Sequence, residues 1–308
     1  MNFVVIGSIN TDFVINTDRM PKVGETIKGS GFLSNNGGKG ANQAIAAAKL
    51  GGDVTFIGAV GNDINGINAI DNLDKNHINT QRIERTSTNT GAAVITVCDG
   101  DNCIILDSGA NDLVTKEVID KNMDIIARAD AVIMQLEIPM ETVAYAAQKA
   151  HEAGVKVVLN PAPITMLPKQ LTDNTDVIIL NETETEYLTK VYPDTDENRK
   201  KCINIIRDKG IDLVIITLGA DGSIYNLDDQ IIHQKAYKTK AVDTTAAGDT
   251  FIGAFCMNID KGLKEAVKYA TAASAITVSR PGASSSIPNK EEIETFLQHK
   301  AVEKNDDI

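Results

Sequence analysis

Apolar runs that alternate with helix-like segments dominate the chain from residue 111 onward. The runs cover residues 131–136, 155–159, 176–180 and 213–217, and the segments between them have helical periodicity. Strands and helices in turn imply right-handed βαβ crossovers and a parallel sheet. No linker rich in Gly, Ser or Pro divides this part. We therefore predict one α/β domain, a three-layer α/β/α sandwich around a mostly parallel sheet.

Two earlier segments lack the helices that a βαβ unit needs. Residues 13–36 alternate weakly and contain Pro21 and several glycines, and residues 91–108 form a predicted hairpin with its turn at 99–102. Together they predict a small separate β-sheet. One face of such a sheet would be apolar and uncovered, so it must pack on something.

Composition limits the classes of function. The 308 residues are 43% hydrophobic and 23% charged, which is ordinary for a globular chain. A net charge of −12 argues against a nucleic-acid partner, although it leaves a phosphorylated ligand open. No apolar run approaches the roughly 20 residues of a membrane helix, so no membrane partner is expected. The first residues resemble a strand rather than a targeting signal, and we expect a cytoplasmic location.

Cysteine and histidine spacing gives no metal-site pattern. Cys98, Cys103, Cys202 and Cys256 form neither a CxxC pair nor a Cys/His zinc spacing, and the four histidines are scattered. We expect reduced and mostly buried cysteines and no zinc site.

The stretch from Asp243 to Phe251 (Asp-Thr-Thr-Ala-Ala-Gly-Asp-Thr-Phe) predicts a loop that enters a helix. Residues 237–242 before it are strand-like, and the apolar residues from Phe251 onward recur at helical spacing. The first N–H groups of a helix have no partner within it and point outward at the positive end of the dipole. Because Ala246, Ala247 and Gly248 are small, an anion can approach this backbone closely.

Asp249 lies in the same turn, where a carboxylate repels an anionic ligand. It suits a base that takes a proton from a hydroxyl attacking phosphorus. Asp is also common as a helix cap, and the local pattern alone does not separate these two roles.

Residues 243–251 resemble the C-terminal signature of the ribokinase-like family of carbohydrate and nucleoside kinases. A second stretch, Gly37-Gly-Lys-Gly-Ala-Asn-Gln-Ala44, resembles the sugar-site loop of that family. Similar stretches run from the first strand to Pro288, and two signatures in the right order are more specific than either alone. The glycine loop is not a Walker A motif, because Leu33 and Gly40 replace its first glycine and its Ser or Thr.

Asn10 and Asp12 follow the first predicted strand, at the edge where open α/β sheets bind ligands. Their donors and acceptors suit vicinal hydroxyls, although the residues alone favour an ordinary turn. The resemblance implies that both hold a sugar. It implies further sugar contacts from Gly38, Lys39, Gly40, Asn42, Glu137 and Asp249.

The resemblance also implies a nucleotide site and two metal sites. Asn181 and Glu184, one helical turn apart, would lie near Mg²⁺ and phosphate, although the residues alone favour a solvated acidic helix start. The nucleotide would contact Asn181, Thr217, Leu218, Gly219, Ala220, Asp221, Gly222 and Gly248. A monovalent cation, K⁺ as first choice, would lie among Asp243, Thr245, Thr277, Arg280, Gly282 and Ser286. Members of the family often carry Asn near the adenine, where this chain has Thr271.

The function implied by the resemblance is ATP-dependent phosphorylation of a sugar's primary hydroxyl, with D-ribose to D-ribose 5-phosphate as first choice. Asp249 would be the base, the N–H groups of 246–248 would stabilise the transferring phosphoryl group, and Mg²⁺ would accompany ATP. Segments 13–36 and 91–108 would form a lid over the sugar and pair with the lid of a second subunit in a homodimer.

Two other interpretations of the same signatures stay open. The first is a kinase for fructose, a keto-deoxy sugar acid or a nucleoside. A nucleoside pocket would want aromatic stacking, and aromatics make up only 4% of the chain, with no Trp. A sugar acid would want a basic residue beside its carboxylate. The second is a sugar-binding regulator without catalysis, which the intact Asp249 and both signatures disfavour.

Overall fold

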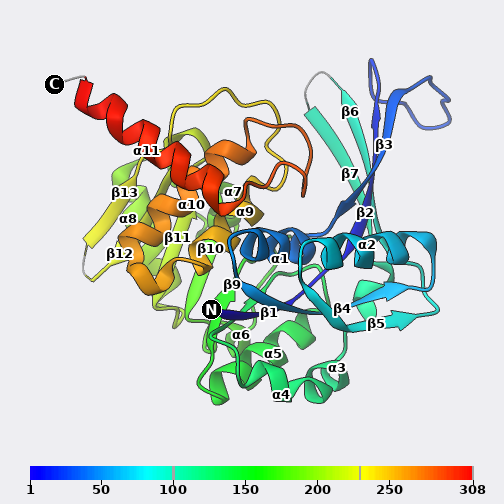
Figure 1. The fold of residues 1–308 in the computed structure, drawn as a ribbon, viewed down its shortest axis with the longest axis horizontal. Helices are drawn as coiled ribbons and strands as arrows, with labels where there is room; N and C mark the ends of the chain where they lie inside the picture. The colour runs from blue at the N-terminus through cyan, green and yellow to red at the C-terminus, as the bar shows by residue number, and fades with distance from the viewer. Residues whose placement is uncertain (99–100, 229, 307–308) are drawn as a thin grey trace.

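A nine-stranded sheet forms the middle layer of the molecule (Figure 1). The computed structural model describes residues 1–98, 101–228 and 230–306. The strand order is β13-β12-β11-β10-β9-β8-β1-β4-β5, and pairing is parallel from β5 to β11 and antiparallel for β12 and β13. The strands are β1 (Asn2–Ile6), β4 (Asp53–Gly61), β5 (Asn79–Thr86), β8 (Ala131–Met134), β9 (Lys156–Leu159), β10 (Val177–Leu180), β11 (Leu213–Thr217), β12 (Ser223–Leu227) and β13 (Gln230–Gln234). The predicted, mostly parallel sheet is confirmed.

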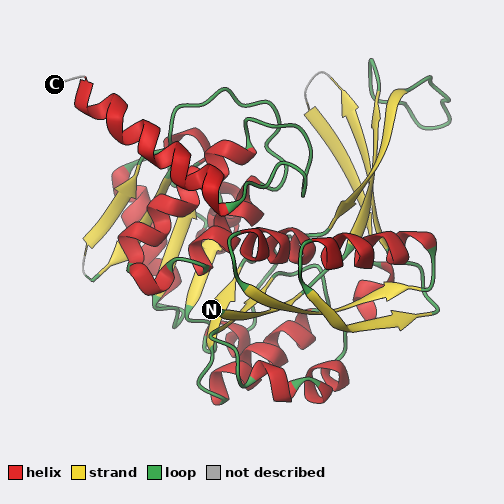
Figure 2. Cartoon of the chain, in the orientation of Figure 1, coloured by secondary structure: helices red, strands yellow, loops and turns green. Residues whose placement is uncertain are grey.

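Helices cover both faces of this sheet, which makes the predicted three layers (Figure 2). One face packs against α1 (Lys39–Lys49), α2 (Ile64–Lys75), α9 (Ala247–Cys256), α10 (Leu263–Thr277) and α11 (Lys290–Asp306). The other face packs against α3 (Lys116–Lys121), α4 (Met123–Ile126), α5 (Met140–Glu152), α6 (Lys169–Thr172), α7 (Glu182–Thr189) and α8 (Asp196–Arg207). Short 3₁₀ turns are η1 (Gly109–Leu113), η2 (Gly219–Asp221) and η3 (Ile259–Lys261).

Strand β1 shows why the central strands are continuous apolar runs. Phe3 and Val5 lie in the core beneath α1 and α9, whereas Val4 and Ile6 lie in the core on the opposite face. Successive side chains point to opposite faces, so a strand covered on both sides must be apolar at every position. Burying each such side chain contributes about 1.5–3 kcal/mol. This burial holds the parallel strands in register, so that their carboxyl ends form one edge.

A second, four-stranded sheet projects from the layered body (Figures 1 and 2). Its order is β3-β2-β6-β7, built from β2 (Asn10–Asn16), β3 (Ser30–Gly37), β6 (Gly91–Cys98) and β7 (Asp101–Asp107). We call it the lid sheet. The prediction of a separate sheet from residues 13–36 and 91–108 is confirmed. Strands β6 and β7 pair antiparallel as a hairpin, and Asp99 and Gly100 of the predicted turn lie outside the described residues.

Two local features differ from the expectation. The lid sheet begins at Asn10 rather than near residue 13, so Asn10 and Asp12 follow the first strand as expected but lie inside strand β2, and the ordinary turn that the residues alone favoured does not form. The strand-like residues 237–242 form no strand. Instead, the N–H of Val242 donates to the carbonyl of Val278 at the end of α10, over 2.7 Å. That bond takes up backbone that a sheet ladder would need, and local β-propensity without a partner strand does not suffice.

The cysteines only partly follow the expectation. None of the four forms a disulfide; Cys202 and Cys256 are buried, Cys98 is half-buried and Cys103 is exposed on β7 of the lid sheet. The prediction of mostly buried cysteines therefore fails at the lid sheet, which packs on one face at most. Among the described helices, none is long and apolar enough to cross a membrane.

Candidate active site

The predicted anion turn is a loop that enters helix α9. Ala246 precedes the helix in the left-handed region, at φ 60°, and its side chain caps nothing. The N–H of Ala247 donates to the carbonyl of Thr244 over 3.2 Å, which removes one of the three donors expected from the sequence. Within the described chain, the N–H groups of Ala246 and Gly248 have no partner. Two donors at the positive end of α9 therefore remain for an anion.

Asp249 does not cap α9. Its carboxylate is only 8% exposed and accepts two hydrogen bonds from helix α1. The Asn42 Nδ2 lies 3.1 Å from Oδ2, and the Gln43 Nε2 lies 3.0 Å from Oδ1. Both donors are side-chain amides, so they fix the carboxylate without neutralising it. The structure thus disfavours the capping role and leaves a held, ionisable group beside the anion turn.

Gln43 connects Asp249 to the central strands. It is 0% exposed, and its Oε1 accepts from the Gln135 Nε2 over 2.6 Å. Its Nε2 also lies 3.2 Å from the Asn160 Oδ1, and Asn160 in turn donates to the carbonyl of Ile179. Gln135 follows β8 and Asn160 follows β9. The position of the Asp249 carboxylate is therefore set from the edge of the main sheet.

The residues predicted to hold a sugar gather around Glu137. Its Oε2 accepts from the Ser8 Oγ at 2.5 Å, from the backbone N–H of Lys39 at 3.1 Å and from the Asn10 Nδ2 at 3.5 Å. The Asn10 Oδ1 accepts from the buried Asn111 Nδ2 at 2.7 Å, which orients the amide. The first strand, the lid sheet and helix α1 thus meet at one carboxylate.

Gly38 makes this close meeting possible. It lies at φ 94°, a conformation that glycine adopts without strain, and a Cβ there would lie 2.8 Å from the Asn10 nitrogen and the Ser8 carbonyl oxygen. Any larger residue would push helix α1 away from strand β2. The glycine loop therefore serves close packing of backbone, with Lys39 as the first residue of the helix.

Four carboxylates and one ammonium group share this region. Burial, together with Glu137 and Asp249, raises the pKa of Asp12 from 3.8 to about 6, against the opposing influence of Lys39. Burial alone would lower the pKa of Lys39, but Asp249, Glu137, Glu184 and Asp12 outweigh it and the pKa rises. Lys39 is therefore charged, and the cluster as a whole is rich in hydrogen-bond acceptors. That balance suits hydroxyl groups better than a carboxylate ligand.

A cavity of about 210 Å³ is lined in part by Asp249. It brings Asp249 and the anion turn together with several residues predicted for the nucleotide and magnesium. Its polar lining comprises Lys39, Asn160, Asn181, Glu184, Thr217, Thr244, Gly248 and Asp249.

Asn181 and Glu184 form a capping box at the start of α7. The Asn181 Oδ1 accepts from the N–H of Glu184 at 2.9 Å, and the Glu184 Oε2 accepts from the N–H of Asn181 at 2.9 Å. Glu184 is buried rather than solvated, and burial raises its pKa. The pair is thus a helix start, as the residues alone favoured, that also faces the cavity.

The predicted nucleotide loop follows β11 but only partly reaches the cavity. Thr217 lines it, whereas residues 218–222, which comprise the adjoining turn η2 (Gly219–Asp221) and its two flanking residues, do not. Asp221 is exposed, and its carboxylate lies 3.4 Å from Arg199. Thr271, at the position discussed for the adenine, donates within its own helix to the carbonyl of Val267 over 2.8 Å.

The residues predicted for a monovalent cation lie in two adjacent segments that Asp243 joins. Its Oδ1 accepts from the N–H of Thr245 at 2.9 Å and its Oδ2 from the N–H of Gly282 at 3.0 Å. These bonds outweigh the effect of burial and lower the pKa of Asp243. Thr277 and Ser286 are buried, and the Arg280 guanidinium pairs with Glu292 at 2.6 Å. Any ligand from Arg280 would therefore be its carbonyl.

Comparison with known proteins identifies the family of this chain. The family model for pfkB family carbohydrate kinases matches residues 2–290. The chain belongs to this family. It is 43% identical to a ribokinase of Haemophilus influenzae over 303 residues, which are 96% of this chain and 98% of the relative. It is 37% identical to a deoxyribokinase of Salmonella typhimurium, over 96% of this chain and 99% of that relative.

Among solved structures, an Arabidopsis thaliana ribokinase complexed with ribose and ATP has a TM-score of 0.88 and 32% identity. The match covers 96% of this chain and 98% of the plant protein. The likeness includes the layered body and the lid sheet together, because both lie within the matched length.

Several polar residues of the site escaped the sequence reasoning: Ser8, Gln43, Asn111, Gln135 and Asn160. Three of them share a signal that was available. Ser8, Gln135 and Asn160 each follow the apolar run of a parallel strand, at the edge where open α/β sheets bind ligands. Gln43 and Asn111 lie on helical turns and carry no such signal, since their partners are distant in sequence.

Proposed function

We propose that this chain is an ATP-dependent kinase that phosphorylates the primary hydroxyl of D-ribose and releases D-ribose 5-phosphate and ADP. The observation that carries this proposal is the place of Asp249. Asp249 lines the cavity together with Ala246 and Gly248, whose N–H groups are unpaired in the described chain, and its charge also acts on Asp12 in the acceptor-rich Glu137 cluster. The two ribokinase relatives and the deoxyribokinase support a pentose as the acceptor.

In the proposed reaction, Asn10, Asp12, Glu137 and the loop from Gly38 to Asn42 hold the sugar hydroxyls. Asp249 takes the proton of the attacking hydroxyl, and the amides of Asn42 and Gln43 keep its carboxylate in place. The N–H groups of Ala246 and Gly248 stabilise negative charge on the transferring phosphoryl group. Lys39, which also lines the cavity, adds a positive charge there. Closure of the lid sheet excludes water, which would otherwise hydrolyse ATP.

Magnesium fits this site in a limited way. Among the described residues, no cluster of three or more His, Cys, Asp or Glu side chains could hold a metal ion by itself. Asn181 and Glu184 each use one oxygen in the capping box, which leaves Glu184 one carboxylate oxygen for a water-mediated contact. Mg²⁺ usually keeps several waters and binds substrate phosphates, so this donor set suits it. When bound with ATP, the ion neutralises phosphate charge.

The electrostatics favour ribose over two of the other acceptors. A keto-deoxy sugar acid would bring a carboxylate to a region that already holds Asp12, Glu137 and Asp249 with only Lys39 to oppose them. A nucleoside would need aromatic stacking, and aromatic residues make up only 4% of the chain, with no Trp.

The test is a coupled assay of ADP release with ATP, Mg²⁺ and one acceptor at a time. We expect the highest kcat/KM for D-ribose, a lower value for 2-deoxy-D-ribose, and little activity with fructose, a keto-deoxy sugar acid or adenosine. ATP without acceptor is the control for hydrolysis. A protein that binds ribose yet releases no ADP with any acceptor would be a regulator, and the proposal would fall.

A monovalent cation, K⁺ as first choice, is part of the proposal. Its ligands would be carbonyl and side-chain oxygens of Asp243, Thr245, Thr277, Arg280, Gly282 and Ser286. The support is the Asp243 carboxylate, which already joins the two segments that carry them. A cation there would stiffen the backbone that leads into the anion turn, without touching the substrate.

A homodimer through the lid sheet is also proposed. Large apolar side chains are exposed on the lid sheet, among them Phe32, Leu33, Val94, Ile104 and Ile105. Phe32, Val94 and Ile105 share one face of the sheet, because Val94 pairs with Ile105 and side chains alternate along a strand. A second lid sheet packed on that face would remove it from water. In this proposal residues 1–308 act as one kinase domain, with a lid formed by about 13–36 and 91–108, and work in the cytoplasm where ATP is available.

A further inference from the structure

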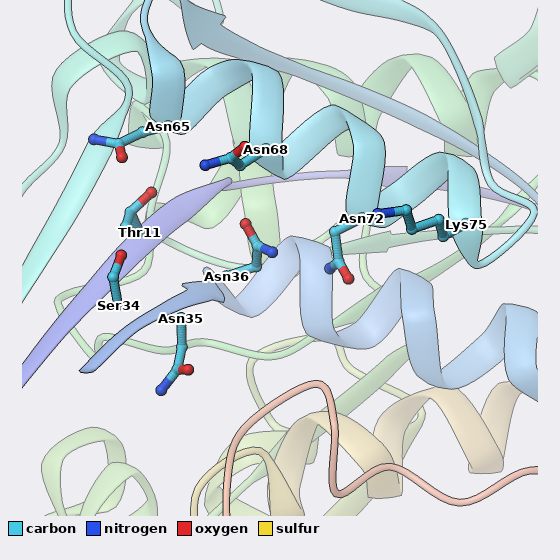
Figure 3. A pocket seen from close by; sticks show the side chains of 8 residues that line it. All are labelled: Thr11, Ser34, Asn35, Asn36, Asn65, Asn68, Asn72 and Lys75. Atoms are coloured by element: carbon cyan, nitrogen blue, oxygen red, sulfur yellow. The ribbon is translucent and has the colours of Figure 1, made fainter.

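A second polar cavity, of about 230 Å³, lies between the lid sheet and helix α2 (Figure 3). Strands β2 and β3 contribute Thr11, Ser34 and Asn36, and α2 contributes Asn65, Asn68, Asn72 and Lys75. The cavity shares no lining residue with the one beside Asp249. Because side chains alternate along a strand, Thr11 faces away from the side that its neighbours Asn10 and Asp12 present to the Glu137 cluster. We call it the lid–α2 cavity.

The polar groups of this cavity lack protein partners. Thr11 is only 4% exposed, and its Oγ1 is buried without a hydrogen bond in the described chain. The side-chain amides of Asn36, Asn68 and Asn72 also have no partner among the described residues, and Figure 3 shows them gathered between α2 and β3. Buried hydroxyls are nearly always bonded to protein, water or ligand. Thr11 lines the cavity, so a molecule bound there is placed to supply this partner.

The composition of α2 supports a binding role for this surface. Asn65, Asn68, Asn72 and Lys75 recur at helical spacing on one face, while Ala69, Ile70 and Leu73 bury another face in the core. Asparagine is a poor helix former, because its side chain competes for backbone hydrogen bonds. A row of three on one helix weakens the helix and adds no packing. A ligand that bonds to the amides gives the row a physical reason.

The lining also specifies the chemistry of the ligand. Each amide offers a donor and an acceptor, and each hydroxyl of a sugar or polyol requires both. The lining has no carboxylate, and its only charge is the exposed Lys75, in a chain with a net charge of −12. We propose that the lid–α2 cavity binds a small neutral polyol, such as a monosaccharide, apart from the phosphoryl-transfer site.

An occupant of the cavity would act on the lid sheet. It would contact Thr11 and Asn36 on β2 and β3 and the asparagines on α2, and so join the lid to the body. Thr11 lies between Asn10 and Asp12 in β2, so any shift of this strand also moves the two side chains that face the Glu137 cluster. The cavity is thus placed to change the affinity of the first site.

The experiment is calorimetric titration of the full-length protein with D-ribose, without nucleotide. We expect two classes of site in the native chain. Asn68→Leu should weaken one class roughly tenfold or more, which corresponds to about one or two lost hydrogen bonds. Asp12→Ala should weaken the other class. Asn62→Leu is the matched control, since Asn62 is exposed just before α2 and lines neither cavity.

The outcomes separate this inference from the proposed function. A titration in which Asn68→Leu and Asn72→Ala behave like Asn62→Leu overturns the lid–α2 site, whatever Asp12→Ala does. If Asn68→Leu removes one class of ribose-binding site and the native protein forms no ADP from ribose, the lid–α2 site is retained and the kinase assignment is rejected. Titration with inorganic phosphate tests the other ligand class. If phosphate binds, Lys75→Leu abolishes that binding, and no ribose site depends on Asn68, the ligand is an anion and the proposed polyol is overturned. Thermal melting of each variant identifies any that does not fold.

Discussion

The Gln43 Nε2 donates a hydrogen bond to the Asp249 Oδ1 over 3.0 Å, and this bond joins helix α1 to the first turn of α9. The same side chain accepts from Gln135 and also lies within bonding distance of Asn160. Gln43 is fully buried, so each of these bonds operates without competition from solvent. Gln43 acts as a positioning residue, which holds the carboxylate and does not itself reach the substrate.

Replacing Gln43 with Met should lower kcat about 10- to 100-fold, with a smaller change in the KM values. The change conserves volume but removes one hydrogen bond from the carboxylate, which then loses its fixed direction. Gln43→Glu should instead place a like charge beside Asp249 and move the acidic limb of the pH–kcat profile upward. Gln148→Met, at a half-buried position on α5 that lines neither cavity, is the control. Native kcat and an unshifted pH profile in both variants would remove the positioning role.

Asp249→Asn should leave the binding of ribose and ATP largely intact and cut turnover. Loss of a general base typically costs about 10²–10⁴-fold in rate. Calorimetry for each ligand and steady-state kinetics measure the two effects separately, with Asp260→Asn as a control at an exposed carboxylate. Turnover near that of the native protein would exclude Asp249 as the base.

Asp12→Asn should stabilise the protein above pH 6 and change little below pH 4. The pKa of Asp12 rises from 3.8 to about 6 in the folded state, chiefly through burial. The folded chain therefore binds the proton more tightly than the unfolded chain, and stability falls as the pH rises through this window. The full penalty is about 3 kcal/mol at most, and an uncharged amide avoids it. Urea unfolding of both proteins at pH 4 and pH 8 measures the difference, and an equal gain at both values would contradict this origin.

Exchange of Na⁺ for K⁺ should change turnover or nucleotide affinity more than sugar affinity. The proposed cation lies beside Asp243 and acts by fixing the backbone of 243–249, so that the N–H groups face the phosphate before reaction. Kinetics in Na⁺, K⁺ and a bulky organic cation at constant ionic strength provide the measurement. Identical constants in all three salts would exclude the cation site.

Light scattering at working concentration should report a dimer. Ile105→Asp, on the exposed lid sheet, should shift the equilibrium towards the monomer, because a charge buried in an apolar interface is costly. Met166→Asp changes an equally exposed apolar residue away from the lid sheet and serves as the control. A native protein that scatters as a monomer would refute the dimer without affecting the assignment of the active site.

The main sheet was predictable because strands buried on both faces need an apolar residue at every position. The anion turn was also predictable, since the small residues and Asp249 are local to one loop. The contact between Gln43 and Asp249 was not, because the two residues are far apart in sequence and only the packing of α1 on α9 brings them together. The start of strand β2 at Asn10 was not predictable, because nothing local to residues 7–9 marks a change from one sheet to another.

Helix α1 is a single rigid element whose first residues border the Glu137 cluster and whose next turn holds Asp249. Selection for a new sugar that reshapes Gly38, Lys39 or Gly40 will tilt this helix and move the Asn42 and Gln43 amides with it. Specificity and turnover therefore evolve together at this loop. Variants with an altered sugar preference should arise more readily through Asn10 or Asp12, whose side chains do not hold the helix, than through Glu137, which accepts from the N–H of Lys39 at its start.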